Sequence, residues 1–367
     1  MLRYAHELVS QLVLALGSEG ATFAVGVGKE PLVDPEDMSS SSVIFDWTVL
    51  CTLHELLRDG RVNATGPEGK LLSTVATHKT EGQIPEYRRP VWRGLTEAGS
   101  VNIEFVEPGW TAGAVRRERQ AQKGDLLIAL SGGQGVEHLA QLYALGGKPV
   151  IPLDLDLGAS MADGAGGAAR LAERALAHPE RFARFSDTDA AAGLLSRMST
   201  RGGESEIPQV VSGIVDVLHA LDPPSAFYVR LVNESHPEFM YVERFFRSVV
   251  TPVVEGLGYR PIDISRDYNE YAWMNEAIFD SLHHSAVTVV DLTGLRNNCF
   301  LEYGYALGRQ QRVILTARNG TELPFDTAAI DCHLWEADVD DARKTGFEAY
   351  WSRNIDRPPL VKPREIL

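Results

Sequence analysis

The sequence predicts an α/β protein of two Rossmann-like domains, each built on a doubly wound, mainly parallel sheet. Short apolar runs of strand length alternate with longer amphipathic runs of helix length in both halves of the chain, which is the pattern of parallel sheets. Several strands are apolar throughout, such as "AVTVV" at 286–290, as expected of strands buried on both faces. A chain of 367 residues with 44% hydrophobic residues is also long enough for two cores.

The first half opens with an amphipathic helix at 1–17, which carries His6, Glu7 and Gln11 and does not fit a signal peptide or a membrane span. The elements expected after it are a strand at 21–28, a helix at 43–60, a strand at 124–133, a helix at 135–147, a strand at 148–155 and an Ala-rich helical stretch at 158–200. A polar loop at 199–208 and a helix at 209–221 follow, and "DPPS" at 222–225 ends that helix. We therefore expect domains at 1–221 and 222–367.

The second half has a regular order of strands and helices. The expected elements are strands at 226–232, 259–265, 286–294, 312–317 and 332–337, with helices at 238–258, 271–285 and from about 297. Each helix lies between two strands, so the strands are expected to be parallel.

Composition limits the classes of function. The net charge is −15, which disfavours a nucleic-acid partner and favours small ligands or proteins. The three cysteines, Cys51, Cys299 and Cys332, are unclustered and odd in number, so neither a disulfide framework nor a metal site is expected, and a cytoplasmic location is.

A glycine-rich turn in the first half is a candidate nucleotide site. Ser131, Gly132 and Gly133 end an apolar strand, and Gly135 precedes a helix. Glycines allow a phosphate to approach the backbone, and the N-terminus of the helix offers unpaired N–H groups. The turn alone fits a tight connection without a ligand equally well. Gly28 with Lys29, and the basic cluster Arg116, Arg117 and Arg119, are weaker candidates for the same site, since an ordinary turn and a solvated helix face explain them as well.

This stretch resembles the SLOG superfamily, the LOG/STALD-like group that includes cytokinin-activating phosphoribohydrolases. Gly132, Gly133 and Gly135 match its Gly-Gly-x-Gly-Thr loop, and "GKPV" matches the strand that follows. Val136 replaces the threonine, and Leu139 stands where the active hydrolases have a glutamate. The resemblance therefore implies nucleotide binding, without hydrolysis in this domain, as in the sensor domains of bacterial anti-phage proteins.

One glutamate in the second half, Glu302, is a candidate catalytic residue. It lies within the first two turns of the helix that follows a strand ending in Asp291, at the ligand-binding edge expected of a parallel sheet. Helical spacing places Cys299, Tyr303, Ala306 and Leu307 toward the sheet, with Asn298, Glu302, Tyr305 and Arg309 together on one flank. Such a carboxylate could act at the C1′ carbon of a nucleoside, or it could pair with Arg309 on a solvated face. Asn297 and Asn298 are candidate N-caps of the helix, and Gly304 would leave room for a ligand.

The stretch 286–317 resembles the nucleoside 2-deoxyribosyltransferase family and its TIR-like relatives. Asp291, Thr293, Asn298, Glu302, Gly304, Ala306 and Gly308 match the typical pattern. The resemblance implies Glu302 as nucleophile, Asp291 as the acid that positions the substrate, and Asn298, Tyr228 and Gly304 near the substrate. Asp263 and Asp267 are further acids that could line the site or lie in a loop, while His283 and His284 are expected to pack or to cap a helix end. "ELPFD" at 322–326 also resembles part of the pattern.

Together these features predict an enzyme that cleaves an N-glycosidic bond under the control of a nucleotide signal. NAD, a nucleoside or a nucleotide is the expected substrate, no cofactor is required, and the resemblance of the architecture implies anti-phage defence and a homo-oligomer. Two alternatives stay open, a nucleotide-binding protein without chemistry and a true nucleoside deoxyribosyltransferase.

Overall fold

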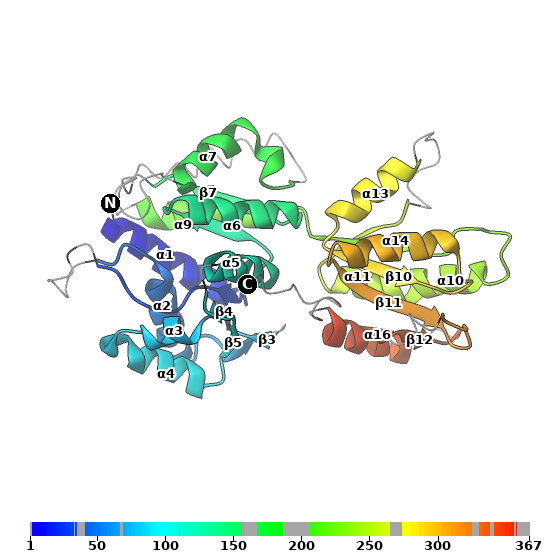
Figure 1. The fold of residues 1–367 in the computed structure, drawn as a ribbon, viewed down its shortest axis with the longest axis horizontal. Coiled ribbons are helices and arrows are strands. Elements are labelled where there is room, and N and C mark those ends of the chain that lie inside the picture. The colour runs from blue at the N-terminus through cyan, green and yellow to red at the C-terminus, as the bar shows by residue number, and fades with distance from the viewer. Residues whose placement is uncertain are drawn as a thin grey trace. The chain divides into compact units, whose positions relative to one another are not determined.

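The protein divides into two compact α/β units, Met1–Asp222 and Pro223–Leu367 (Figure 1). The computed structural model describes residues 2–32, 34, 41–66, 69–109, 111–155, 157, 167–185, 206–264, 274–324, 330–337, 341–355 and 357. The sheets are mainly parallel and helices connect their strands, so the predicted α/β fold class is confirmed.

In its described residues, the N-terminal unit contains two parallel sheets and one short antiparallel ribbon. The strands are β1 (Phe23–Ala24), β4 (Leu72–Ala76) and β5 (Val101–Phe105) in the order β1-β4-β5, the pair β6 (Leu127–Leu130) and β7 (Val150–Leu153), and the ribbon β2 (Thr65–Gly66) with β3 (Gly69–Lys70). The strand expected at 21–28 is thus limited to two residues, because the chain from Gly26 onward is held by side chains of other segments.

Helices surround these strands. They are α1 (Leu2–Ser18), α2 (Asp46–Arg58), α3 (His78–Gly82), α4 (Arg89–Glu97), α5 (Ala112–Lys123), α6 (Gln134–Leu145), α7 (Gly167–Ala177) and α9 (Ile207–His219), with 3₁₀ turns at Glu86–Arg88 and Pro179–Arg181. Of the Ala-rich stretch at 158–200, α7 is helical as predicted, whereas 158–166 and 186–200 lie outside the described residues, as do 199–205 of the expected loop.

The C-terminal unit is built on one five-stranded parallel sheet in the order β12-β11-β10-β8-β9. The strands are β8 (Ser225–Val229), β9 (Arg260–Ile262), β10 (Val287–Asp291), β11 (Arg312–Arg318) and β12 (His333–Trp335). In the register of the central strands, Val290 pairs with Val229 of β8 and with Leu315 of β11. The carboxyl ends of β8, β10 and β11 therefore lie at the same edge of the sheet.

Helices cover both faces of this sheet. One face, called the α16 face below, packs against α10 (Phe239–Phe245), the π-helical turn Phe246–Val250, α11 (Thr251–Gly256) and α16 (Asp341–Asn354). The opposite face, called the α14 face, packs against α13 (Met274–His284) and α14 (Asn297–Gly308). Helices on both faces of a parallel sheet make a doubly wound arrangement.

The helices in the described ranges include none that is long and apolar enough to cross a membrane. In the same ranges, no group of three or more His, Cys, Asp or Glu side chains is arranged to hold a metal ion.

Candidate functional site

The C-terminal sheet has a topological switch point between β8 and β10. The helix after β8 covers the α16 face and the helix after β10 covers the α14 face, so the two connections leave the sheet in opposite directions. In open parallel sheets, the crevice outside the carboxyl ends of two such strands is the usual ligand site. The loops 230–238 and 292–296 lie where this ligand site is expected.

Glu302 lies in the second turn of α14, beside the buried stripe of that helix. Of the predicted sheet-facing stripe of α14, Cys299, Tyr303 and Ala306 are buried, as expected, and Leu307 is partly buried. Tyr305, one turn after Glu302 on the same flank, turns toward α13, and its hydroxyl lies 2.7 Å from Nδ1 of His283. His283 thus packs as expected, and the flank of Glu302 is the one that faces α13.

The carboxylate of Glu302 is half-buried and has no hydrogen-bond or ion-pair partner among the described residues. It makes no ion pair with Arg309, the alternative that helical spacing left open. Because burial disfavours the charged form, the pKa of Glu302 is raised from its ordinary value of 4.5 to about 7. Near neutral pH the side chain therefore exists in both protonation states, which is a common property of catalytic carboxylates.

Asp291 points to the other face of the sheet. Alternation along β10 places it with Val289 on the α16 face, whereas Val290 and the stripe of α14 share the opposite core. The carboxylate is fully buried and accepts from the Thr293 backbone N–H at 3.0 Å, the Thr316 hydroxyl at 2.7 Å and Trp335 Nε1 at 2.8 Å.

These three hydrogen bonds indicate a structural role for the Asp291 carboxylate. Burial raises its pKa, and the hydrogen bonds from Thr293, Trp335 and Thr316 oppose that shift. The carboxylate ties β10 to β11, to β12 and to the loop that leads into α14. In this structure it does not face Glu302 or solvent, so a direct contact with a ribose hydroxyl stays a prediction.

The other residues expected near the substrate lie apart from Glu302, with one exception. Asn298 is exposed, one turn before Glu302 on the same flank. Tyr228 is buried in the core of the α16 face, with its hydroxyl 3.4 Å from Thr251 Oγ1. Gly304 is exposed, because two residues after Glu302 the helix has turned by about 200°.

The expectation of an asparagine N-cap for α14 is wrong, since Arg296 is the N-cap and it makes no side-chain capping bond.

A buried guanidinium supports the crevice from the end of β8. Arg230, whose side chain is 1% exposed, contacts Glu243 of α10 at 2.9 Å and Asp263, after β9, at 2.7 Å. Asp263 is therefore held in an ion pair, and Asp267 lies outside the described residues, as do Phe325 and Asp326 of the "ELPFD" segment. Arg230 joins the chain segments that follow β8 and β9.

In the N-terminal unit, the loop between β6 and α6 adopts an unusual backbone conformation. Ser131 and Gly132 have φ of 53° and 76°, which costs a non-glycine residue such as Ser131 free energy. The carbonyl groups of Ser131 and Gly132 accept from the first N–H groups of α7, and a Cβ on Gly167 would lie 2.5 Å from the Gly133 oxygen. The carbonyl groups of the loop thus bind the N-terminus of α7, and helix α6 begins at the C-terminal end of the loop.

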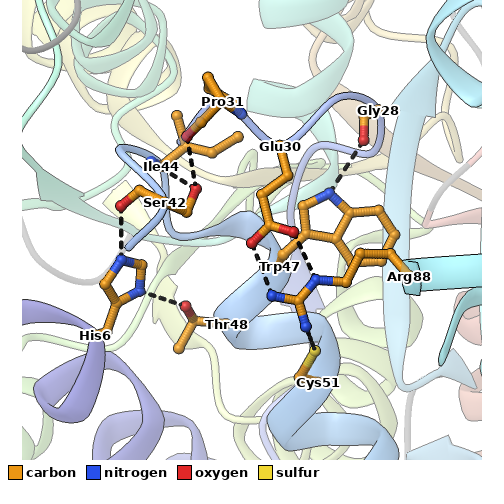
Figure 2. A network of polar contacts seen from close by, with 10 residues as sticks. All are labelled: His6, Gly28, Glu30, Pro31, Ser42, Ile44, Trp47, Thr48, Cys51 and Arg88. Carbon is orange, nitrogen blue, oxygen red and sulfur yellow. Dashed lines mark hydrogen bonds and ion pairs between the residues drawn. The ribbon is translucent and has the colours of Figure 1, made fainter. Parts of the chain in front are cut away.

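The second glycine segment, Gly26–Glu30, is held at three points, and Figure 2 shows those at Gly28 and Glu30. The Gly26 N–H donates to the buried Asp46 at 2.6 Å, and Trp47 Nε1 donates to the Gly28 oxygen at 3.1 Å. Glu30 accepts from Arg88 at 2.6 and 2.8 Å, and Arg88 also lies 3.0 Å from the Cys51 sulfur. Lys29, between the anchored positions, is exposed and has no partner among the described residues.

Two neighbouring arginines of α5 reach both glycine segments. Arg116 lies 3.8 Å from where a Cβ on Gly26 would stand, and Arg117 lies 3.7 Å from the corresponding position on Gly135. Burial lowers the pKa of Arg116, which the nearby Asp46 carboxylate opposes. Arg117 donates from Nε to His138 at 2.9 Å. The third basic residue, Arg119, instead pairs with Glu104 at 3.5 Å.

These positions assign different chemistry to the two units. Positive side chains and glycine backbone meet in the N-terminal unit, where an anionic ligand would be favoured. In the C-terminal unit, a carboxylate of raised pKa without a partner among the described residues lies on the helix that follows the switch-point strand β10, where it could stabilise positive charge on a sugar carbon. Sequence reasoning missed Trp335 and Thr316 as partners of Asp291, because nothing local connects positions so far apart in the chain.

Comparison with known proteins finds two curated relatives and one family. Two curated relatives named ATP nucleosidase Cap17, from Escherichia coli strain KTE188 and from Escherichia coli, are each 25% identical over 162 residues, which is 44% of this chain. The chain spans only 30% of the length of these relatives. No solved structure matches it significantly. The family described as ATP nucleosidase Cap17-like, N-terminal, matches residues 1–218, and the chain belongs to that family.

Proposed function

We propose that the C-terminal unit cleaves the N-glycosidic bond of a nucleotide or nucleoside, with Glu302 at the reacting carbon. The observation that carries this proposal is the half-buried Glu302 carboxylate, which has no partner among the described residues and whose pKa is raised to about 7. Its place on the first helix after the switch-point strand, next to the usual ligand crevice, supports the same chemistry.

In the proposed reaction, the ionised Glu302 attacks C1′ or stabilises its positive charge as the base departs. The bond between C1′ and the base nitrogen breaks, and its electron pair leaves with the base, which takes up a proton from solvent. Water then supplies the hydroxyl group at C1′. Asp291 acts from behind the sheet by fixing the loop that leads into α14, and Asn298 is the neighbour of Glu302 that is free to contact a sugar hydroxyl.

The N-terminal unit, in this proposal, binds a nucleotide that controls the reaction. Its glycine loop Ser131–Gly135 and the anchored segment Gly26–Glu30 bring backbone close to the ligand, while Lys29, Arg116 and Arg117 supply positive charge. Residues 1–218, which contain both glycine segments, match the ATP nucleosidase Cap17-like N-terminal family. The name of the relatives makes ATP one of the substrates or signals to test. A homo-oligomer and a role in anti-phage defence belong to the same proposal.

The experiment is an assay for free base. The full chain is incubated with ATP, NAD, adenosine or 2′-deoxyadenosine, each alone and together with cyclic nucleotides or ADP-ribose, and released base is separated by chromatography. Wild type should release base under at least one condition, and Glu302→Gln should reduce the rate by at least about 100-fold. Glu348→Gln, the same change on an exposed position of α16, is the control and should keep the wild-type rate. Equal background release by wild type and Glu302→Gln would reject the enzyme.

A second candidate is a nucleotide-binding protein without chemistry. The burial of Asp291 and Tyr228 away from Glu302 favours it, because two groups expected beside the sugar lie in the core of the α16 face. Binding of ATP or NAD by calorimetry, without release of base under any condition, would select this candidate. A labelled second base in the assay tests the third reading, since a deoxyribosyltransferase would incorporate it into a new nucleoside.

A further inference from the structure

His236 is a histidine of the crevice that the proposed reaction has not yet used. It lies in the loop between β8 and α10, one of the two loops that border the switch point. Its ring packs on the other loop, since a Cβ built on Gly294 would lie 2.9 Å from Cε1 and 3.3 Å from Nε2 of His236. The two loops therefore meet where this imidazole lies.

The loop that carries His236 is held by its own hydrogen bonds. The His236 N–H donates to the Asn233 oxygen at 3.0 Å, the Phe239 N–H donates to the His236 oxygen at 2.9 Å, and the Ser235 N–H donates to the Asn233 side chain at 3.1 Å. Glu238 of the same loop is paired with Arg318 at the end of β11. The position of the ring is thus fixed before any ligand binds.

The tautomer of the neutral ring follows from one contact. Nδ1 of His236 lies 3.2 Å from the Glu238 N–H and accepts from it, so Nδ1 carries no proton and the ring proton is on Nε2. In the part of the chain that the structure describes, Nε2 has no hydrogen-bond partner, although the side chain is only half-exposed. An oriented N–H donor, without an acceptor among the described residues, thus lies where the two loops of the switch point meet.

Gly294 is the residue that lets the ring approach. It has a φ of 80°, a conformation that favours glycine, and any side chain there would meet the ring of His236. The next residue, Leu295, also has a positive φ of 50° although it is not glycine. Backbone strain of this kind is held where surrounding contacts require it, here in the loop that leads from Asp291 to the helix of Glu302.

We infer that His236 is a substrate-contacting residue of the proposed glycosidic reaction, whose Nε2–H donates a hydrogen bond to an acceptor atom of the bound nucleotide or nucleoside. This inference depends on the proposed function and adds a second point of contact to it. Glu302 acts at C1′ from α14, and His236 orients the substrate from the loop after β8. A donor that is already fixed in position loses little conformational entropy when it binds.

Two substitutions separate this role from a structural one. His236→Asn places an amide oxygen near the position of Nδ1, so it keeps the acceptor for the Glu238 N–H but lacks a donor at the place of Nε2. His236→Gln places an amide nitrogen near the position of Nε2, so it keeps the donor and gives up the Nδ1 contact. If His236 only stabilises its loop, Asn should preserve activity. If it contacts the substrate, Gln should preserve activity.

The test measures kcat/KM for base release from the substrate found active in the assay of the full chain, together with the urea midpoint of each variant. We expect His236→Asn to lower kcat/KM roughly tenfold with an unchanged midpoint, and His236→Gln to stay within about threefold of wild type. The opposite ranking, with Asn active and Gln inactive, overturns the inference but leaves the function standing. Wild type without base release under any condition is a failure of the proposed function itself, and the binding constants of the same variants for ATP and NAD then test the contact by the same ranking.

Discussion

The indole of Trp335 donates from Nε1 to the carboxylate of Asp291 across 2.8 Å, and both side chains are buried. The same Oδ2 atom accepts from Thr316, while Oδ1 accepts from the Thr293 N–H. The acid that the resemblance to deoxyribosyltransferases places near the substrate is thus the point where β10, β11, β12 and the loop after β10 are joined. Its contribution to the crevice is made through that loop.

Replacing Asp291 with asparagine should destabilise the C-terminal unit. The amide group has one oxygen for three donors, and its NH₂ group would face a donor in either orientation. We expect a loss of about 2–4 kcal/mol in the free energy of unfolding, measured by urea denaturation. Trp335→Phe removes a single donor and should cost less than Asp291→Asn through this contact, although it also leaves space in the core. An asparagine variant as stable as wild type would contradict the role of this carboxylate as a junction.

The stability of the protein should depend on pH through Glu302. Its pKa in the folded protein, about 7, lies above its ordinary 4.5, so the folded state binds more protons between these values and stability falls as pH rises from about 4.5 to 7. Glu302→Gln removes this effect and should stabilise the protein at pH 8 by about 2–3 kcal/mol relative to its effect at pH 4. Urea midpoints at both pH values measure the difference. Glu348→Gln, on an exposed surface, should change little, and an equal response of both variants would argue against burial as the cause.

The rate of base release should follow the same ionisation. If the charged form of Glu302 acts at C1′, kcat/KM rises with pH through about 7 and then reaches a plateau. The profile is measured between pH 5 and 9 at constant ionic strength. A rate that falls through this range would instead identify the protonated carboxyl as the active form, and a flat profile would remove Glu302 from the chemical step.

Arg230→Met should be strongly destabilising. The guanidinium is 1% exposed and contacts both Glu243 and Asp263, which are 22% and 12% exposed, so its removal breaks two ion pairs of partly buried carboxylates. We expect a loss of about 3–5 kcal/mol, measured by urea denaturation. Arg247→Met is the matched control, because Arg247 is exposed on the π-helical turn of the same unit. It should stay within about 0.5 kcal/mol of wild type, and a similar loss in both variants would mean that the buried ion pairs contribute little.

Binding of nucleotide by the N-terminal unit should depend on Arg117 and Lys29 but not on Arg119. Arg117 reaches the glycine loop and Lys29 is exposed between anchored residues, whereas Arg119 pairs with Glu104. We expect Arg117→Gln and Lys29→Gln each to weaken binding of ATP about five- to tenfold, with a reduced salt dependence, in calorimetric titrations. Arg119→Gln should leave the affinity unchanged. Equal affinities of all three variants would place the ligand elsewhere.

Much of the fold could be predicted because its strands are short apolar runs between helices. The buried stripe of α14 follows from helical spacing, and so does the flank that carries Glu302. The helix α16 was missed although Phe347, Tyr350, Trp351 and Asn354 are buried at helical spacing; its mixture of charged and aromatic residues hides the pattern. The strands β4 and β5 were missed because each is short and contains polar residues, such as Ser73 and Asn102.

The site was harder to predict than the fold. The alternation of side chains in β10 indicates that Asp291 shares a face with Val289, but the sequence does not tell which face α14 covers. The donors of Asp291 come from β11 and β12, and a hydrogen bond between residues 44 positions apart leaves no local pattern. For the same reason His236 was not singled out, since its meeting with Gly294 depends on the order β10-β8 in the sheet.

Glu302 lies on a helix and His236 on a loop, so ligand specificity can diverge between related proteins while the position of Glu302 is kept. The helix is held by its packing on the sheet, whereas the loops at the crevice are tied mainly to each other and to the strand ends. Exchange of the segment 232–237 between related chains would change the loop after β8 while Arg230 and the loop that leads into α14 stay in place. New specificities could therefore arise, or be engineered, by grafting loops onto one unchanged reactive helix.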